Sequence, residues 1–188
     1  TTVVQDRAEK AMRDAIRKLP DGVYENVVWG SGMGTPERYP IKITIRGDEI
    51  EVDYEGVPPQ AEKGAANCTL GYIRGHTTYP LKCMLTPDVP GNAGCHRPFT
   101  IKVPEGSLFN AKKPAAVNLR TRTGWFNSAN IFMAMAEAAP DQVQAFTGLP
   151  TSQLFYGRDA EGQFYDDHLF QGGGQGIVRF PRKGVEGL

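Results

Sequence analysis

The chain has 188 residues, and its 21 Lys and Arg residues balance 21 Asp and Glu residues, so the formal net charge is zero. This length fits a single domain, residues 1–188, that is large enough to bury an apolar core. The charge balance disfavours nucleic acid or an anionic membrane surface as a partner, and no apolar run approaches the roughly 20 residues of a membrane span.

The first part of the chain is predicted to form one helix followed by three strands. Apolar residues recur at helical spacing over 8–19 and stop before Pro20, which indicates an amphipathic packing helix. A strand is expected over 23–29, and alternating Ile and polar residues predict strands over 41–45 and 50–54. We expect these strands to form an antiparallel hairpin sheet with one wet face.

The second part is predicted to add two helices and four short strands. Apolar periodicity favours helices over 65–85 and 125–139, and the latter should be buried because it is apolar on more than one face. The strands are expected over 99–103, 115–119, 153–156 and 163–169, the last two paired across a turn-rich connector. The expected fold class is therefore α+β: an antiparallel sheet with packed helices, rich in loops.

Two adjoining segments place Gly, Pro and Asn at close intervals. They are Pro90-Gly-Asn-Ala-Gly-Cys-His-Arg-Pro98, which surrounds one Cys, one His and one Arg, and Val103-Pro-Glu-Gly-Ser-Leu-Phe-Asn110. Glycine permits tight turns and close backbone approach, and proline stiffens what lies between. Such loops are built to hold one shape.

Together with two upstream segments, these loops resemble motifs of the hydantoinase B/oxoprolinase family in their residues and in their order along the chain. The upstream segments are Leu19-Pro-Asp-Gly-Val-Tyr24 and Val52-Asp-Tyr-Glu-Gly-Val-Pro-Pro-Gln60. Downstream, Pro114-Ala-Ala-Val117 and the Gly-rich run 171–176 occupy comparable places. Glu55 stands where the family usually has Ser, and Pro58 is an additional proline. Family subunits are several times longer, so we expect this chain to be an internal portion of a larger subunit.

The resemblance implies a part in an ATP-dependent hydrolase of a cyclic amide, such as a hydantoin or 5-oxoproline. It leaves two alternatives open: a portion of an ATP-dependent ketone carboxylase of the acetone or acetophenone type, and a non-catalytic assembly domain of such a complex. The implied partners are an actin/hexokinase-like ATPase subunit, which binds ATP and Mg²⁺, and the remainder of the same large subunit. We expect no cofactor in this chain itself. Any divalent metal is expected in the upstream part, where related carboxylases have their metal-binding stretches.

Two residues of the 90–98 loop are the candidate catalytic residues. A guanidinium held in a stiff loop suits bidentate capture of a carboxylate or phosphate, so Arg97 is the first candidate, with an internal salt bridge as the alternative. Cys95 has a thiol beside His96 and Arg97, a setting that can lower a thiol pKa, but it can equally be a buried packing residue.

Four polar residues are the candidate substrate-binding residues: Asn67, Asn92, Arg120 and Arg122. The asparagines can bind an amide-like substrate or simply cap local turns. The arginines precede a predicted helix, whose N-terminus attracts anions, or they belong to a solvated strand end. The Gly-rich run 172–176 lacks the pattern of a phosphate loop, so we interpret it as a turn.

No metal site is assigned, because His168 and its neighbours Asp166 and Asp167 alternate faces in a predicted strand. The cysteines, Cys68, Cys83 and Cys95, are odd in number and lack Cys-x-x-Cys spacing, which favours neither a disulfide framework nor a zinc knuckle. The simplest compartment is a reducing cytoplasm.

Overall fold

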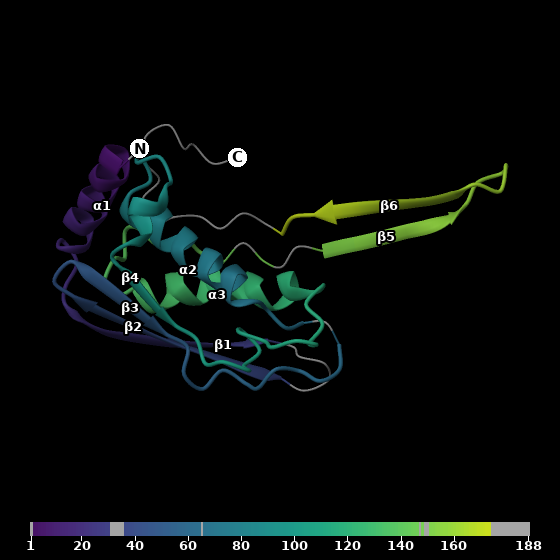
Figure 1. Cartoon of the computed structure of the whole chain (residues 1–188), viewed down its shortest axis with the longest axis horizontal. Helices are drawn as coiled ribbons and strands as arrows, with labels where there is room; N and C mark the ends of the chain where they lie inside the picture. The colour runs from purple at the N-terminus through teal and green to yellow at the C-terminus, as the bar shows by residue number, and fades with distance from the viewer. Residues whose placement is uncertain (1, 31–35, 65, 147, 149–150, 174–188) are drawn as a thin grey trace.

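The computed structural model describes residues 2–30, 36–64, 66–146, 148 and 151–173 (Figure 1). Residues 174–176 of the Gly-rich run therefore lie outside the described residues. Within them, the elements follow one another as α1 (Thr2–Ile16), β1 (Gly22–Gly30), β2 (Glu37–Arg46), β3 (Glu49–Asp53), α2 (Leu70–Leu85), the 3₁₀ helix η1 (Ala93–His96), β4 (Phe99–Lys102), α3 (Arg120–Met135), β5 (Thr151–Arg158) and β6 (Phe164–Gln171). The α+β class predicted from the sequence is confirmed.

Four strands form one sheet in the order β1-β2-β3-β4. The pairs β1–β2 and β2–β3 are antiparallel, as expected, with Ile43 opposite Tyr24 and Val52. The edge strand β4 runs parallel to β3, with Val52 opposite Ile101. The expectation of a purely antiparallel sheet was wrong at this edge, because the chain crosses over through α2 between β3 and β4 and so returns in the same direction.

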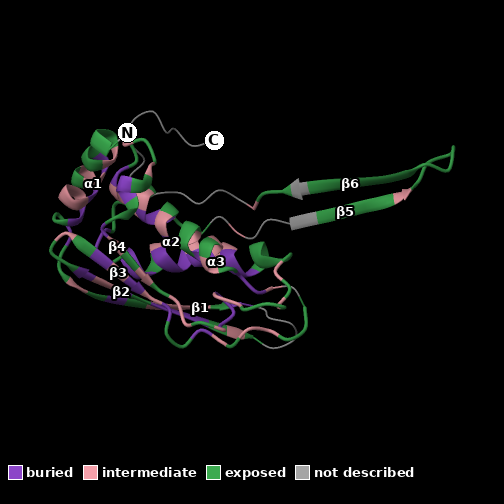
Figure 2. Cartoon of the chain, viewed as in Figure 1, coloured by how far each residue is buried: buried purple, intermediate pink, exposed green. Residues whose placement is uncertain are grey.

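The helices α2 and α3 cover one face of this sheet, and the opposite face is open (Figure 1). The alternation in β2 explains the arrangement: Ile41, Ile43 and Ile45 are at most 2% exposed, whereas the intervening Lys42 is exposed. On the helix side, Ile131 and Met135 of α3 are fully buried in the same cluster (Figure 2). The predicted wet face of the sheet is confirmed.

The amphipathic helix α1 packs mainly on η1, far along the chain. It buries Ala8, Met12 and Ile16, which share one helical face. A Cβ at Gly94 in η1 would lie 1.9 Å from the main-chain oxygen of Gln5, so only glycine permits this approach. The helix begins at residue 2 and ends at residue 16, earlier at both ends than the predicted range of 8–19.

Both later helices begin at positions that the apolar pattern did not mark. Helix α2 starts at Leu70, not 65, because Thr69 is its N-cap and accepts a hydrogen bond from the Tyr72 amide at 3.3 Å. Helix α3 starts at Arg120, and of two residues expected to be buried, Ala134 is 5% and Met133 55% exposed. The burial prediction therefore holds for only one face of α3.

The strand predicted over 115–119 is wrong. The main chain there makes local turns: the Ala115 amide donates to the Lys112 oxygen at 3.1 Å, and the Arg120 amide donates to the Val117 oxygen at 3.3 Å. The oxygen of Ala116 accepts instead from a side chain, Asn67. These bonds replace the strand pairing that the apolar composition suggested.

The strands β5 and β6 form a separate two-stranded antiparallel ribbon, which confirms the predicted pairing. The ribbon extends away from the helices and the sheet (Figure 1). Large apolar side chains on both of its faces are exposed, among them Leu154, Phe155, Tyr156, Phe164 and Tyr165 (Figure 2). No helix in the described part of the chain is long and apolar enough to cross a membrane.

Candidate functional site

Asn92 shapes the 90–98 loop from within. Its side-chain oxygen accepts a hydrogen bond from the Gly94 amide at 2.9 Å, and its side-chain nitrogen donates to the Pro90 oxygen at 3.1 Å. Asn92 is therefore the N-cap of η1, as the turn-capping alternative predicted. Its proposed contact with a substrate stays a prediction.

Arg97 is directed at α1. Its Nη1 donates to Asp6 at 2.8 Å and to Glu9 at 2.9 Å, and its Nη2 donates to Gln5 at 3.2 Å. The hydrogen bonds to Glu9 and Asp6 raise the pKa of Arg97, and the bond from Arg97, together with one from Arg13, lowers the pKa of Glu9. The guanidinium thus forms the internal salt bridge that was the alternative to anion capture, and its catalytic assignment stays a prediction.

Cys95, which lies between Asn92 and Arg97 in the sequence, is fully buried. Its Sγ lies 3.9 Å from the Pro90 oxygen, and its amide donates to the Asn92 oxygen at 3.1 Å. The neighbouring His96 is exposed, and partial loss of hydration lowers the pKa of its imidazole. The position of Cys95 fits the packing alternative, and a catalytic role for its thiol stays a prediction.

Asn67 joins the loop between β3 and α2 to the loop between β4 and α3, and it has no exposed surface. Its side-chain nitrogen donates to the oxygens of Ala61 at 3.0 Å and Ala116 at 3.1 Å, and its side-chain oxygen accepts from the Ala61 amide at 2.8 Å. Both amide hydrogens are used by the main chain. In this arrangement Asn67 holds the loops together, and substrate binding by it stays a prediction.

Arg120 and Arg122 lie in the first turn of α3, as predicted near a helix start, and both are exposed. The guanidinium of Arg120 lies 5.6 Å from the ring centroid of Tyr72 on α2, a cation–π contact. Its main-chain oxygen lies 3.6 Å from the thiol of Cys68. Burial raises the pKa of Cys68 to about 12, and the charge of Arg120 offsets this only in part.

The structure thus sorts the six candidates into two groups. Asn67 and Arg120 approach one another through Cys68, at the beginnings of α2 and α3. Arg122 is exposed in the first turn of α3, beside the first group. The other group, Asn92, Cys95 and Arg97, lies in and beside η1 against α1.

The second of the two motif segments, residues 103–110, forms hydrogen bonds with main-chain groups of other loops. The Leu108 amide donates to the Pro58 oxygen at 2.8 Å, and the Leu108 oxygen accepts from the Cys68 amide at 2.7 Å. Gly106 has a φ of +77°, which favours glycine, and Ser107 donates to the Pro104 oxygen at 2.6 Å. The motif residues therefore interlock loops from distant parts of the chain.

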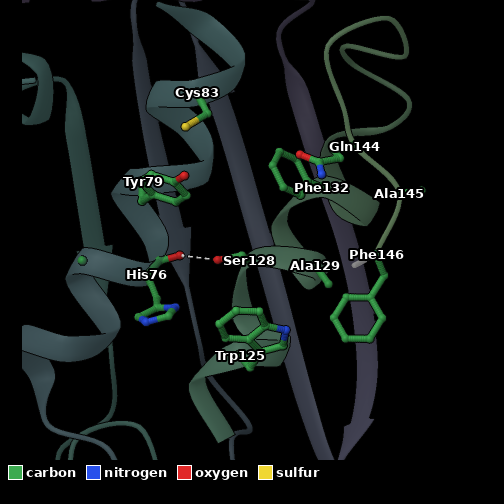
Figure 3. Close-up of a pocket in the computed structure, with 11 residues that line it drawn as sticks. His76, Tyr79, Cys83, Trp125, Ser128, Ala129, Phe132, Gln144, Ala145 and Phe146 are labelled. Atoms are coloured by element: carbon green, nitrogen blue, oxygen red, sulfur yellow. Dashed lines mark hydrogen bonds between the residues drawn. The ribbon is translucent and has the colours of Figure 1, made fainter. Parts of the chain in front are cut away.

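A groove between α2 and α3, closed on one side by residues 144–146, was not predicted from the sequence (Figure 3). We call it the α2–α3 groove, and its cavity volume is about 480 Å³. Its lining consists of Gly75, His76, Tyr79, Cys83, Trp125, Ser128, Ala129, Phe132, Gln144, Ala145 and Phe146. The available signal was the helical spacing of its aromatic and polar residues on α2 and α3, which is equally typical of residues that pack in a core.

A proline inside α2 gives the groove one of its polar contacts. Pro80 has no N–H, so the main-chain oxygen of His76, four residues earlier, lacks its usual helical donor. The hydroxyl of Ser128 on α3 donates to this oxygen at 3.5 Å (Figure 3). The proline therefore opens a position at which α3 bonds to α2.

The groove is electrically neutral. The described residues that line it include no Asp, Glu, Lys or Arg. Burial lowers the pKa of His76, so its imidazole is uncharged at neutral pH, and the adjacent Cys83 raises the pKa of Tyr79. The Trp125 indole donates to the Gly148 oxygen at 2.7 Å, which fixes its ring at the groove.

Comparison with known proteins finds relatives along almost the whole chain. The family model described as hydantoinase B/oxoprolinase matches residues 1–185. A protein of Pseudomonas sp. (strain NS671), provisionally named as the B component of a D-/L-hydantoinase, is 28% identical, over 96% of this chain and 32% of its own length. The beta chain of the caprolactamase of Pseudomonas jessenii is 31% identical, over 84% of this chain and 28% of its own length.

Two solved structures are similar in fold. The ATP-dependent caprolactamase of Pseudomonas jessenii superposes on 89% of this chain with a TM-score of 0.73 at 28% identity, covering 29% of that structure's chain. Acetone carboxylase in its nucleotide-free form covers 86% of this chain with a TM-score of 0.71 at 13% identity, a likeness of fold alone. The chain spans about a third of the length of the relatives named here, or less. Because the family model covers almost the whole chain, the chain belongs to the hydantoinase B/oxoprolinase family.

Proposed function

We propose that this chain is part of an ATP-dependent hydrolase that opens a cyclic amide of the hydantoin, lactam or 5-oxoproline class. One observation carries the proposal: the caprolactamase structure matches 89% of this chain at 28% sequence identity. In this proposal ATP and Mg²⁺ are held by an actin/hexokinase-like ATPase partner, the remainder of the large subunit completes the site, and the complex works in the cytoplasm.

In the proposed reaction the amide is first activated by phosphoryl transfer and the ring is then opened, and different parts of the complex perform these two steps. An amide carbonyl is a poor electrophile, and transfer of a phosphoryl group from ATP to its oxygen makes the carbon reactive. Water then adds to that carbon and the ring C–N bond breaks, with the ring nitrogen taking up a proton, which leaves an acyl phosphate. A second water cleaves the acyl phosphate, so that ATP, the cyclic amide and two water molecules give ADP, phosphate and the open-chain acid. After activation, the subunit that contains this chain needs mainly to position the ring and the water.

Within that subunit, the Gly- and Asn-rich motifs have an architectural role in our proposal. Arg97 binds Asp6 and Glu9 of α1, and Asn67 binds main-chain groups of two loops. This observation also favours the second candidate function, a non-catalytic assembly domain of the same complex. A ketone carboxylase is supported by likeness of fold only.

The test uses the complete large subunit expressed together with its ATPase partner. We expect phosphate release from ATP to rise when hydantoin, ε-caprolactam or 5-oxoproline is added, and the ring-opened acid to appear. Stimulation by acetone with bicarbonate, and by no cyclic amide, would replace the proposal with the carboxylase alternative. No stimulation by either class would contradict both enzymatic functions.

A further inference from the structure

We propose that the α2–α3 groove binds the neutral ring of a cyclic amide and disfavours rings that carry a carboxylate. This inference rests on the proposed function and specifies where the ring lies and which substrates are preferred. It concerns binding by residues of this chain, none of which belongs to the motif loops.

The size and shape of the groove suit a small ring. A volume of about 480 Å³ lies within the range of small-molecule pockets, about 300–1,000 Å³. Trp125 and Phe132 on α3 lie beside His76 and Tyr79 on α2 (Figure 3). Aromatic side chains of this kind pack favourably against the CH₂ groups of ε-caprolactam and against the flat ring of hydantoin.

The polar groups of the groove match an amide. A neutral amide in a ring has one N–H donor and one carbonyl acceptor, so it needs one partner of each kind. The uncharged imidazole of His76 has one donor and one acceptor nitrogen, and the hydroxyl of Tyr79 can serve as either. The hydroxyl of Ser128, which donates to the His76 main-chain oxygen, can still accept a hydrogen bond.

The same neutrality penalises a charged ligand. A carboxylate that enters a site without a cation loses its hydration and gains no ion pair. Since the described lining has no Lys or Arg, 5-oxoproline, which carries a carboxylate, should bind more weakly than ε-caprolactam or hydantoin. If the groove is the ring site, its uncharged lining makes the affinity for ε-caprolactam and hydantoin higher than the affinity for 5-oxoproline.

Two glycines of α2 offer a matched pair of variants. Gly75 lines the groove, and Gly71 lies on the same helix outside it. A Cβ built at either position meets no atom within 4 Å, and both residues are exposed, so each accepts a larger side chain without a clash. Gly75→Phe should fill the groove, and Gly71→Phe is the control for the added side chain.

The experiment is equilibrium dialysis of radiolabelled ε-caprolactam against the complete complex without ATP. We expect saturable binding, about tenfold or more weaker in Gly75→Phe and unchanged in Gly71→Phe. Unlabelled hydantoin should compete, and 5-oxoproline should compete at least about tenfold less well. Equal binding by wild type and Gly75→Phe, absence of binding by both neutral rings, or equal competition by 5-oxoproline would overturn the inference.

Turnover by the same proteins separates this inference from the proposed function. If the wild-type complex opens cyclic amides and Gly75→Phe does so with an unchanged KM, the groove is not the ring site although the function stands. If neutral rings bind in the groove but no cyclic amide stimulates phosphate release, the groove assignment stands and the proposed function fails.

Discussion

At the scale of single residues, a catalytic and a structural role of Arg97 predict different effects of its substitution on Tm and on kcat/KM. Because its guanidinium binds two carboxylates of α1, we expect Arg97→Lys to lower the Tm by weakening contact between α1 and the loop. If the ion pairs are its whole role, kcat/KM of the complete complex stays near the wild-type value.

The measurement is Tm by calorimetry together with kcat/KM for each cyclic amide. A fall in kcat/KM of about 10- to 100-fold, with little change in Tm, would restore the catalytic assignment. Arg7→Lys, which replaces an exposed arginine of α1, is the matched control for loss of a guanidinium.

The same contact predicts a dependence on pH. Hydrogen bonds from Arg97 and Arg13 lower the pKa of Glu9 in the folded chain, so the ionised form stabilises the fold. That stabilisation is fully present above the ordinary Glu pKa, about 4.3, and is lost as the pH falls through the lower folded value. We expect Glu9→Gln to have a lower Tm than wild type at neutral pH, with the difference disappearing in strong acid. A difference that is independent of pH would mean that the charge of Glu9 is not its cause.

Sequence reasoning was least informative about what these polar side chains bind. The pattern correctly marked Arg97 and Asn92 as fixed in a stiff loop, since glycine, proline and asparagine have local backbone preferences. It could not say that the partner of Arg97 would be α1, because that contact joins residues 91 apart in the sequence. The contact of Asn67 with the Ala116 oxygen, 49 residues away, was hidden for the same reason.

At the scale of elements, the bond between α2 and α3 depends on a proline. We expect Ser128→Ala to cost about 0.5–1 kcal/mol of unfolding free energy when Pro80 is present, because the His76 oxygen then loses its donor. In a Pro80→Ala background the restored helical N–H supplies the donor, and the same change should cost close to nothing.

Urea unfolding of the four proteins in this double-mutant cycle measures the coupling. Packing lost by removing the proline ring cancels in the cycle, so only the shared oxygen of His76 contributes. Additive effects of the two substitutions would show that Ser128 does not replace the missing helical donor.

Elements with strict alternation were predicted well, and those whose limits depend on capping were not. In β2 and β3 each second residue is apolar, and the observed strands contain the predicted ranges to within a residue. The start of α2 depends on the Thr69 cap, and α3 begins in the polar run 120–123, which carries no apolar stripe. The α2–α3 groove was missed because residues that line a groove have the same helical spacing as residues that pack in a core.

At the scale of the whole molecule, the ribbon of β5 and β6 leaves apolar surface uncovered on both faces. Phe155 and Tyr165 lie on one face and Leu154 and Phe164 on the other, and all four are exposed. A two-stranded ribbon is marginally stable in water without further packing, and exposed apolar patches commonly mark contact surfaces. This fits our proposal that the remainder of a large subunit surrounds the chain.

The corresponding prediction concerns activity. Purified alone and supplied with ATP, Mg²⁺ and hydantoin, ε-caprolactam or 5-oxoproline, the 188-residue chain should release no phosphate above background. The positive control is the complete complex at the same concentration, and a colorimetric phosphate assay is the measurement. Sustained turnover by the isolated chain would contradict the proposed dependence on a partner.

The docking of α1 on η1 also sets an order of events during folding. A helix of 15 residues is marginally stable in isolation, and the surface that covers this one lies some 90 residues later in the chain. During synthesis α1 therefore leaves the ribosome with Ala8, Met12 and Ile16 uncovered, and it can only join the fold after the loop has closed. Pulsed hydrogen exchange during refolding should show the amides of α1 becoming protected no earlier than those of η1. Earlier protection of α1 would mean that the helix first packs elsewhere and moves to the loop afterwards.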